Sequence, residues 1–395
     1  MWRLGFFFHE MSFGLLSVFI PLYVIAIGGS LVDIGIIIAI ALFLAIPASF
    51  FWGYMCDRTR RYKRYILVSF LSSAVALYFF TFTSSILLLA VLYAMMSIFH
   101  IAHEPPKNVL IAELYSREEW GKAFAVYEGF TEAGWLVGLV LGFVVSVYGV
   151  SSTSTLLLCS GLNLVAFVIS LFLVADPAFV FERGLVNIEK TIDFTYRGVA
   201  IASRMLDGYS TNQKLKRENL GAICLGLVLF SLATSVLFTP LPVFLSRDLL
   251  LPASMVFAMY ILNSSAGVAG YIVAGRRSNS GSEKPAMNRL LVFRAVLAFA
   301  FIGVAQVPTY QLASTAVILI LYNFAYALFL VLVLSLTMEL VPAGKSGLFN
   351  VLIGAGAAGG SFVGPFLAEK FGFTSVFFVT GAIFVSSYLA FKIYS

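Results

Sequence analysis

Residues 31–64 read LVDIGIIIAIALFLAIPASFFWGYMCDRTRRYKR, and they are the most informative segment of the chain. No charged side chain lies between Asp33 and Asp57, an interval long enough for a helix to cross the hydrocarbon core of a bilayer. Five basic residues then follow between Arg58 and Arg64. An apolar run that ends in a basic cluster is typical of a membrane-spanning helix that leaves the bilayer on its cytoplasmic side.

The composition extends this interpretation to most of the chain. Of the 395 residues, 61% are hydrophobic and 11% are charged, and the mean hydropathy is +0.98. Soluble domains carry about 45–50% apolar and about 25% charged residues, so a soluble globular protein is excluded. We predict an all-α membrane protein whose partner is the lipid bilayer. The net charge of +6 is explained by basic loops, and we expect no nucleic-acid partner.

Twelve segments are apolar and long enough to span the membrane, with breaks where charge, Gly, Pro and Ser collect. The predicted spans are 4–27, 33–54, 65–83, 85–113, 122–146, 152–174, 220–244, 252–275, 288–306, 311–336, 346–367 and 373–393. If the chain crosses the membrane at each span, 21 of the 25 Lys and Arg residues lie on one side of the membrane and 2 on the other. The remaining two, Lys107 and Arg294, fall inside spans. Because cytoplasmic loops carry the basic excess, we predict a multi-pass protein of the cell membrane with both termini in the cytoplasm.

A long polar segment divides the spans into six and six. We predict an N-terminal six-helix bundle at 1–174, a cytoplasmic linker at 175–218 and a C-terminal six-helix bundle at 219–395. Residues 112–142 align without a gap on 338–368, with Glu and Leu, several glycines and a Val-Gly pair matching. Two halves of like topology, related by an axis along the membrane normal, form the parallel-repeat plan of one class of transporter.

Glycines recur every four residues along the two matching spans, which lets helix backbones approach closely. We expect these positions where the two bundles touch and slide. The predicted packing positions are Gly134, Gly138, Gly360 and Gly364.

The loop after the second span carries a four-residue motif. A glycine is followed four residues later by an aspartate, then directly by a basic residue, and three residues after that by an arginine. The positions that fit are Gly53, Asp57, Arg58 and Arg61. This pattern resembles the loop 2–3 motif of the major facilitator superfamily, although Arg60 stands where that family usually has glycine and Tyr62 where it usually has a basic residue. Together with twelve spans in a 6+6 repeat, the resemblance covers essentially the whole chain.

The resemblance implies a secondary transporter in which two six-helix bundles rock about a central cavity. In this family the counterpart of Asp57 helps to close the cytoplasmic gate by meeting a helix N-terminus in the other half. Here the candidate is the region of Ser346 and Gly347, because a helix N-terminus attracts an anion. The alternative is that the charged loop only fixes the topology.

Ionisable groups at membrane depth are costly and are therefore functional candidates. The densest set lies in the fourth span, at positions i, i+3, i+4 and i+7 of one helix face, where Pro105 and Pro106 are expected to kink the helix. The first and fifth spans add further members. The predicted proton-coupling or substrate residues are His9, Glu10, His100, His103, Glu104, Lys107, Glu128 and Glu132. Lys107 and Glu128 are expected to pair, and a purely structural ion pair is the alternative reading for them.

The second half offers uncharged polar and aromatic residues instead, and we expect these to form the opposite wall of the cavity. The predicted cavity residues are Asn263, Tyr322, Asn323 and Tyr326. Arg294 is expected to snorkel from the start of its span to the interface. Ser30 and Asp33 have the spacing of a capping box for the second span.

We predict a secondary transporter that moves a small organic solute by alternating access, coupled to protons, and acts as a monomer. An uncoupled facilitator, a transporter-like solute sensor and a membrane-embedded lipid-modifying enzyme are the alternatives. An enzyme is not expected, because both His-Glu pairs lack the second histidine of a zinc-protease motif. No cofactor is expected, and no metal site is predicted, because the three cysteines lie far apart and no ligand spacing is complete.

Overall fold

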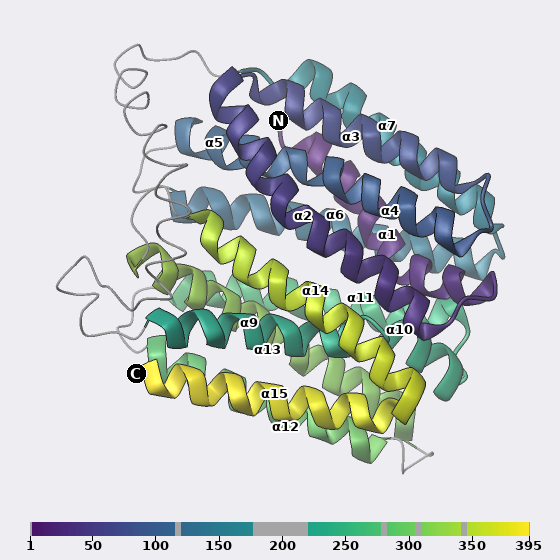
Figure 1. Cartoon of the computed structure of the whole chain (residues 1–395), viewed down its shortest axis with the longest axis vertical. Helices are drawn as coiled ribbons and strands as arrows, with labels where there is room; N and C mark the ends of the chain where they lie inside the picture. Colours follow the sequence, from purple (N-terminus) through teal and green to yellow (C-terminus); the bar gives the residue numbers. More distant parts are fainter. Residues whose placement is uncertain are drawn as a thin grey trace.

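The computed structural model describes residues 2–114, 120–176, 220–277, 283–304, 310–340 and 346–394. Within these ranges every regular element is helical (Figure 1). In the first half the elements are α1 (Leu4–Ala26), α2 (Leu31–Thr59), α3 (Tyr62–Phe80), α4 (Ile86–His100), η1 (Ile101–His103), α5 (Glu104–Leu114), α6 (Trp120–Val147) and α7 (Ser152–Leu173). In the second half they are α9 (Leu220–Phe238), α10 (Leu241–Val243), η4 (Phe244–Asp248), α11 (Ala253–Arg277), α12 (Glu283–Val304), α13 (Gln311–Leu340), α14 (Ser346–Phe371) and α15 (Phe373–Tyr394).

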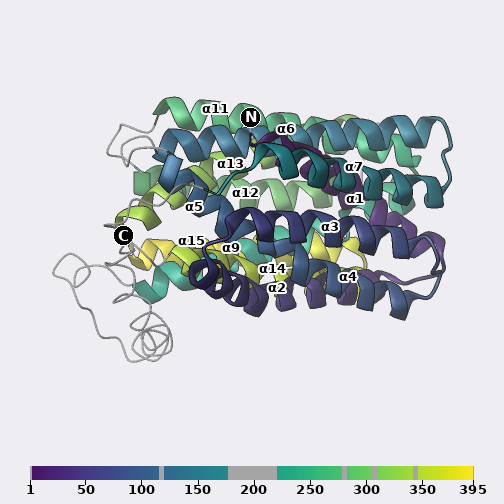
Figure 2. The ribbon, with the colours of Figure 1, turned by 90° about the horizontal axis from the view of Figure 1, so that it is seen from above.

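The long helices run side by side along one direction, as expected for a bundle that crosses a bilayer (Figures 1 and 2). Twelve of the described segments are long and apolar enough to cross a membrane, which confirms the predicted all-α fold with twelve spans. Most of the predicted linker lies outside the described residues, and the division into two bundles around it stays a prediction.

The fourth span is broken near its middle. Helix α4 ends at His100, a single 3-10 turn follows, and α5 starts at Glu104. Pro105 and Pro106 therefore occupy the first turn of α5, where a missing backbone N–H costs no hydrogen bond. The α-helix is thus interrupted by a 3-10 turn where the ionisable side chains of this span are concentrated.

The start of α2 has the predicted capping box. The Ser30 hydroxyl accepts a hydrogen bond from the Asp33 backbone N–H at 3.1 Å, and the Asp33 carboxylate accepts one from the Ser30 N–H at 2.8 Å. The Glu369 carboxylate, near the end of α14, accepts a further bond from the Leu31 N–H at 3.1 Å. One end of α2 is thereby joined to a helix of the other half.

The four predicted packing glycines lie at close helix contacts, but these contacts are inside each half. A side chain at Gly134 or Gly138 of α6 would meet the backbone of α1, and one at Gly360 or Gly364 of α14 would meet the backbone of α9. The expectation that these glycines lie where the bundles slide is therefore wrong. They instead allow two helices of the same half to approach closely, since only hydrogen separates the backbones there.

The two halves meet along two other helix pairs. Helix α2 packs against α14, where Gly35 faces Pro365, and α6 packs against α11, where Gly142 faces the ring of Phe257. Figures 1 and 2 show both pairs lying side by side. The space between these two seams is where a central cavity can form.

Adding one methyl group at Gly138 tests the close contact of α6 with α1. We expect Gly138→Ala to lower the thermal midpoint in detergent, at a cost of about 1–3 kcal/mol, because the new carbon would collide with the backbone at Met11. Gly161→Ala in α7 is the matched control, because nothing lies within 4 Å of its added carbon. That control should be neutral or stabilising through the better helix propensity of alanine. Equal losses in both variants would contradict the packing role.

Candidate functional site

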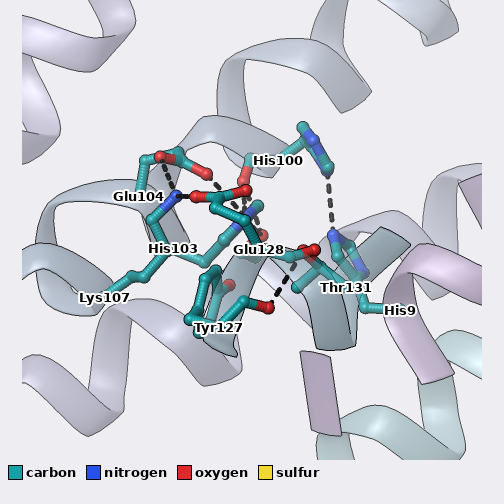
Figure 3. Close-up of polar contacts among 9 residues, drawn as sticks. His9, His100, His103, Glu104, Lys107, Tyr127, Glu128 and Thr131 are labelled. Atoms are coloured by element: carbon teal, nitrogen blue, oxygen red, sulfur yellow. Dashed lines mark hydrogen bonds and ion pairs between the residues drawn. The ribbon is translucent and has the colours of Figure 1, made fainter. Parts of the chain in front are cut away.

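Six of the eight ionisable residues predicted in the first half meet around the break in the fourth span (Figure 3). Helices α4, η1 and α5 supply His100, His103, Glu104 and Lys107, while α1 supplies His9 and α6 supplies Glu128. The 3-10 turn brings His103 and Glu104 to the same side as Lys107. We call these six residues the ionisable cluster.

Lys107 holds the two carboxylates of the cluster together. Its ammonium nitrogen Nζ lies 2.6 Å from Glu104 Oε2 and 3.6 Å from Glu128 Oε1 (Figure 3). The lysine side chain is 8% exposed, that of Glu104 28% and that of Glu128 48%. The same nitrogen lies 5.1 Å from the centre of the Tyr127 ring, a cation–π contact. The predicted pairing of Lys107 and Glu128 is present, and Glu104 is the closer partner.

The histidines form the other side of the cluster. His9 Nδ1 lies 2.6 Å from Asn163 Oδ1, and His9 Nε2 lies 3.0 Å from His100 Nδ1. His103 Nε2 lies 3.3 Å from Glu104 Oε1, and its Nδ1 lies 2.6 Å from the His100 carbonyl oxygen. His9 and His103 are buried. The cluster is thus one continuous polar network from Asn163 to Glu128.

Glu10 and Glu132 stay outside the contacts of the cluster. Glu10, the next residue after His9 on α1, is half-buried and lies within electrostatic range of Glu104, Lys107 and Glu128. Glu132, one helical turn after Glu128 on α6, instead lines a separate cavity.

That cavity has a volume of about 380 Å³ and is bounded by both halves. The first half contributes Phe13, Leu16, Ser17, Ile20, Pro21, Ile38, Tyr93, Glu132 and Trp135. The second half contributes Thr234, Ser235, Phe238, Thr239, Tyr260, Asn263, Ser264, Asn323 and Tyr326. Among these lining residues Glu132 carries the one formal charge. Aromatic rings, hydroxyls and amides make up most of the rest.

Three of the four residues predicted for the opposite wall line this cavity, namely Asn263, Asn323 and Tyr326. The Asn323 amide donates a hydrogen bond to the Asn263 carbonyl at 2.8 Å and joins α13 to α11. The fourth predicted wall residue, Tyr322, does not line the cavity. Its side chain is fully buried behind the wall, because residue 322 faces the interior of the second half while Asn323 and Tyr326 face the cavity.

The prediction that Arg294 snorkels to the interface is wrong. Its side chain is fully buried, and the residue lies at mid-length in α12. Its guanidinium carbon lies 4.2 Å from the centre of the Tyr322 ring and 4.6 Å from that of Phe384. Its Nη2 donates a hydrogen bond to the Thr234 hydroxyl at 3.2 Å. A side chain so far from either helix end cannot reach the interface between membrane and water. In an apolar interior a guanidinium group can instead stack against aromatic faces.

The predicted gate motif lies at the end of α2 and the start of α3. Gly53 and Asp57 are in α2, Arg58 donates a hydrogen bond to the Tyr54 hydroxyl at 3.2 Å, and Arg61 immediately precedes α3 without a side-chain capping hydrogen bond. The side chain of Asp57 and those at the start of α14 lie outside the described residues, so the predicted latch stays a prediction.

Sequence reasoning missed Asn163, which binds His9, and the cavity residues Phe13 and Trp135. A single asparagine inside the apolar run of the sixth span was the available signal for Asn163, since a buried amide needs a partner. Trp135 follows Glu132 at i+3 on the same helix face, and this spacing could have placed it in the cavity.

Comparison with known proteins agrees with this arrangement. The sequence model of the Major Facilitator Superfamily matches residues 4–352, nearly the whole chain. The chain belongs to the Major Facilitator Superfamily. It is therefore a membrane transporter of a small-molecule solute and not an enzyme.

Among its relatives in this superfamily is multidrug resistance protein MdtG of Proteus mirabilis (strain HI4320). The two are 26% identical over 394 residues, which cover 96% of this chain and 91% of that protein. Solved structures with the same fold include a mutant of the nucleoside transporter NupG, at TM-score 0.69 and 13% identity, covering 99% of this chain and 98% of that one. The xylose transporter XylE of E. coli, in a partially occluded inward-open conformation, matches at TM-score 0.70 and 14% identity, covering 98% and 95%.

Replacement of Lys107 tests whether the cluster is held together by charge. We expect Lys107→Met to reduce the free energy of unfolding by roughly 3 kcal/mol, because two carboxylates lose their cation. This loss should appear as a strongly lowered thermal midpoint in detergent. Adding Glu104→Gln to that variant should restore part of the loss by removing one of those charges. Glu128→Gln alone, at a half-exposed carboxylate, should change the midpoint little. Additive losses in the double variant would show that the charges do not interact.

Proposed function

We propose that this protein is a proton-coupled transporter in which Glu132 accepts either a proton or a cationic organic solute. The observation that carries the proposal is the composition of the cavity wall, where Glu132 is the one charged side chain among the lining residues. A carboxylate in an apolar cavity is stable when a proton or a cation neutralises it, and exchange of the two couples their movements.

The rest of the cavity supports a solute that is aromatic as well as cationic. Trp135, Phe238, Tyr260 and Tyr326 offer ring faces, and Asn263 and Asn323 offer amide groups for orientation. A cation near an aromatic face gains electrostatic stabilisation, most of all at tryptophan. The volume is in the range of pockets that accept drug-sized ligands.

One relative supports a drug-like solute. MdtG is named a multidrug resistance protein, and it aligns over 96% of this chain. NupG and XylE carry a nucleoside and xylose according to their names, but at 13% and 14% identity they indicate the fold alone. We therefore assign a small hydrophobic cation from the cavity residues, and the name of MdtG supports a drug-like solute.

The charged loop and the topology complete the proposal. The protein acts as a monomer in the cell membrane with both termini in the cytoplasm, consistent with the basic residues of the loops. Gly53, Asp57, Arg58 and Arg61 form the cytoplasmic gate, which opens and closes as the two halves rock about the cavity. The ionisable cluster supports α1, α5 and α6 beside it.

Proton release on solute binding tests the role of Glu132. With the purified protein in weakly buffered detergent solution, we expect ethidium or tetraphenylphosphonium to release about one proton per bound cation. Glu132→Gln should abolish the release, because no exchangeable proton remains at the cavity wall. The control is Glu128→Gln, one turn away on α6 but paired with Lys107 outside the cavity, which should retain release.

Three results would contradict the proposal. Binding without proton release by the wild type would make the protein an uncoupled facilitator, and unchanged release by Glu132→Gln would place the proton elsewhere. Failure of both probes to bind would remove the cationic solute class.

Substitution at Trp135 tests the aromatic part of the site. We expect Trp135→Leu to weaken binding of tetraphenylphosphonium about tenfold, because a cation–π contact in a desolvated site contributes about 1–2 kcal/mol. Trp135→Phe should keep most of the affinity, because it retains an aromatic face. Equilibrium dialysis in detergent measures both. Equal affinities for the leucine and phenylalanine variants would show that the ring does not contact the solute.

A further inference from the structure

The three histidines of the chain all come together at one point. His9 arrives from α1, His100 from the end of α4 and His103 from the 3-10 turn after it. One ring nitrogen of each lies within 4.8 Å of the others. His9 is fully buried and His103 is 2% exposed, while His100 is partly exposed. Ninety-one residues separate His9 from His100, so the fold and not local sequence brings them together.

The hydrogen bonds around His9 fix which of its nitrogens is free. The Asn163 amide nitrogen donates to the Ser12 hydroxyl at 2.8 Å and to the Cys159 carbonyl at 2.9 Å. Its amide oxygen must therefore accept the bond from His9, and Nδ1 of His9 carries the hydrogen. The lone pair of His9 then lies on Nε2, which faces His100 Nδ1 at 3.0 Å (Figure 3).

The surroundings of His103 fix its free nitrogen in the same way. Nδ1 of His103 lies 2.6 Å from the His100 carbonyl, which can only accept, so Nδ1 carries the hydrogen. Its Nε2 lone pair then faces Glu104 Oε1 at 3.3 Å, although a carboxylate oxygen is also an acceptor. Either a proton on Nε2, which makes His103 an imidazolium, or a metal ion bound by both atoms satisfies this pair.

We propose that His9, His100 and His103 bind a divalent transition-metal ion of the Zn²⁺ class, with Glu104 as the fourth ligand. The ligand atoms are His9 Nε2, His100 Nδ1, His103 Nε2 and Glu104 Oε1. Three imidazoles and one carboxylate form a donor set that Zn²⁺ accepts in tetrahedral geometry. His100 then carries its hydrogen on Nε2 when the ion is bound, since Nδ1 must present its lone pair.

The second layer of contacts is already in place for such an ion. Metal-bound histidines usually donate their other N–H to a carbonyl or carboxylate oxygen, which fixes the ring and the tautomer. Here the Asn163 amide oxygen holds His9 and the His100 carbonyl oxygen holds His103. Lys107 lies against Oε2 of Glu104, and Oε1 is the oxygen that faces His103.

The local charge also favours a cation. Glu104 and Glu128 pair with Lys107, and Glu10 lies within electrostatic range of all three. A divalent ion would offset the remaining negative charge in a region where water is scarce. Phe13 contacts the rings of His9 and His100 and also lines the central cavity, so a bound ion would fix one part of the cavity wall.

Titration with Co²⁺ tests the site directly. The full-length protein is purified in detergent, freed of any histidine tag and of metal, and titrated with Co²⁺. We expect one equivalent to bind with the intense visible absorption of tetrahedral Co²⁺, and one equivalent of Zn²⁺ to remove that absorption. Absence of this absorption in the wild type at saturating Co²⁺ would overturn the proposal.

Variants separate this site from adventitious binding. His103→Gln should weaken Co²⁺ binding at least 100-fold, and His100→Gln, at the partly exposed histidine, repeats the test if the first variant fails to fold. Glu104→Gln should weaken binding about 10- to 100-fold. The matched control is Glu128→Gln, which also removes a partner of Lys107 but no proposed ligand, and it should weaken Co²⁺ binding far less than Glu104→Gln does. Equal Co²⁺ affinity in the wild type and both histidine variants would assign the ion to another part of the protein.

Discussion

The cost of placing a charge inside lipid is the constraint on which this structure depends. Lys107 is nearly buried, and an uncompensated ammonium group at that depth is expensive. Glu104 at 2.6 Å and Glu128 at 3.6 Å compensate it, and the break between α4 and α5 brings Glu104 into that position. The two prolines after Glu104 fit in the first turn of α5 without losing a hydrogen bond. A feature that would weaken an ordinary helix is therefore compatible with the ion pair.

The two halves of the chain accommodate buried charged side chains in different ways. In the repeat register Glu128 corresponds to Gly354 and Glu132 to Ala358, so the fold itself needs no charge at these places. The second half instead contains Arg294, whose guanidinium group is surrounded by the rings of Phe230, Tyr322, Tyr326 and Phe384. The first half therefore groups carboxylates and imidazoles around Lys107, whereas the second half places a guanidinium group among aromatic rings.

The sequence alone was sufficient to predict the features that depend on interactions between residues close together in the chain. Apolar length placed the twelve spans, helix-start chemistry predicted the capping box at Ser30 and Asp33, and helical spacing grouped His100 to Lys107. It was not sufficient where distant helices meet. The bond between His9 and Asn163 joins α1 to α7, and the ring cage of Arg294 joins α9, α12, α13 and α15. The packing glycines show the same limit, because their spacing predicts a close contact but not which helix makes it.

The separation of Glu132 from Glu104 has a physical consequence for transport. Both are carboxylates of the first half, yet Glu104 is paired with Lys107 and faces His103, while Glu132 lines the cavity. A carboxylate bound to a buried ammonium group has little tendency to exchange a proton, because the pair loses its attraction when the acid is neutralised. In the proposed function, the charge cluster between α1, α5 and α6 is therefore fixed, and Glu132 is the acid that exchanges its proton at the cavity. The two regions are nevertheless adjacent, because the Phe13 ring packs against His9 and also lines the cavity.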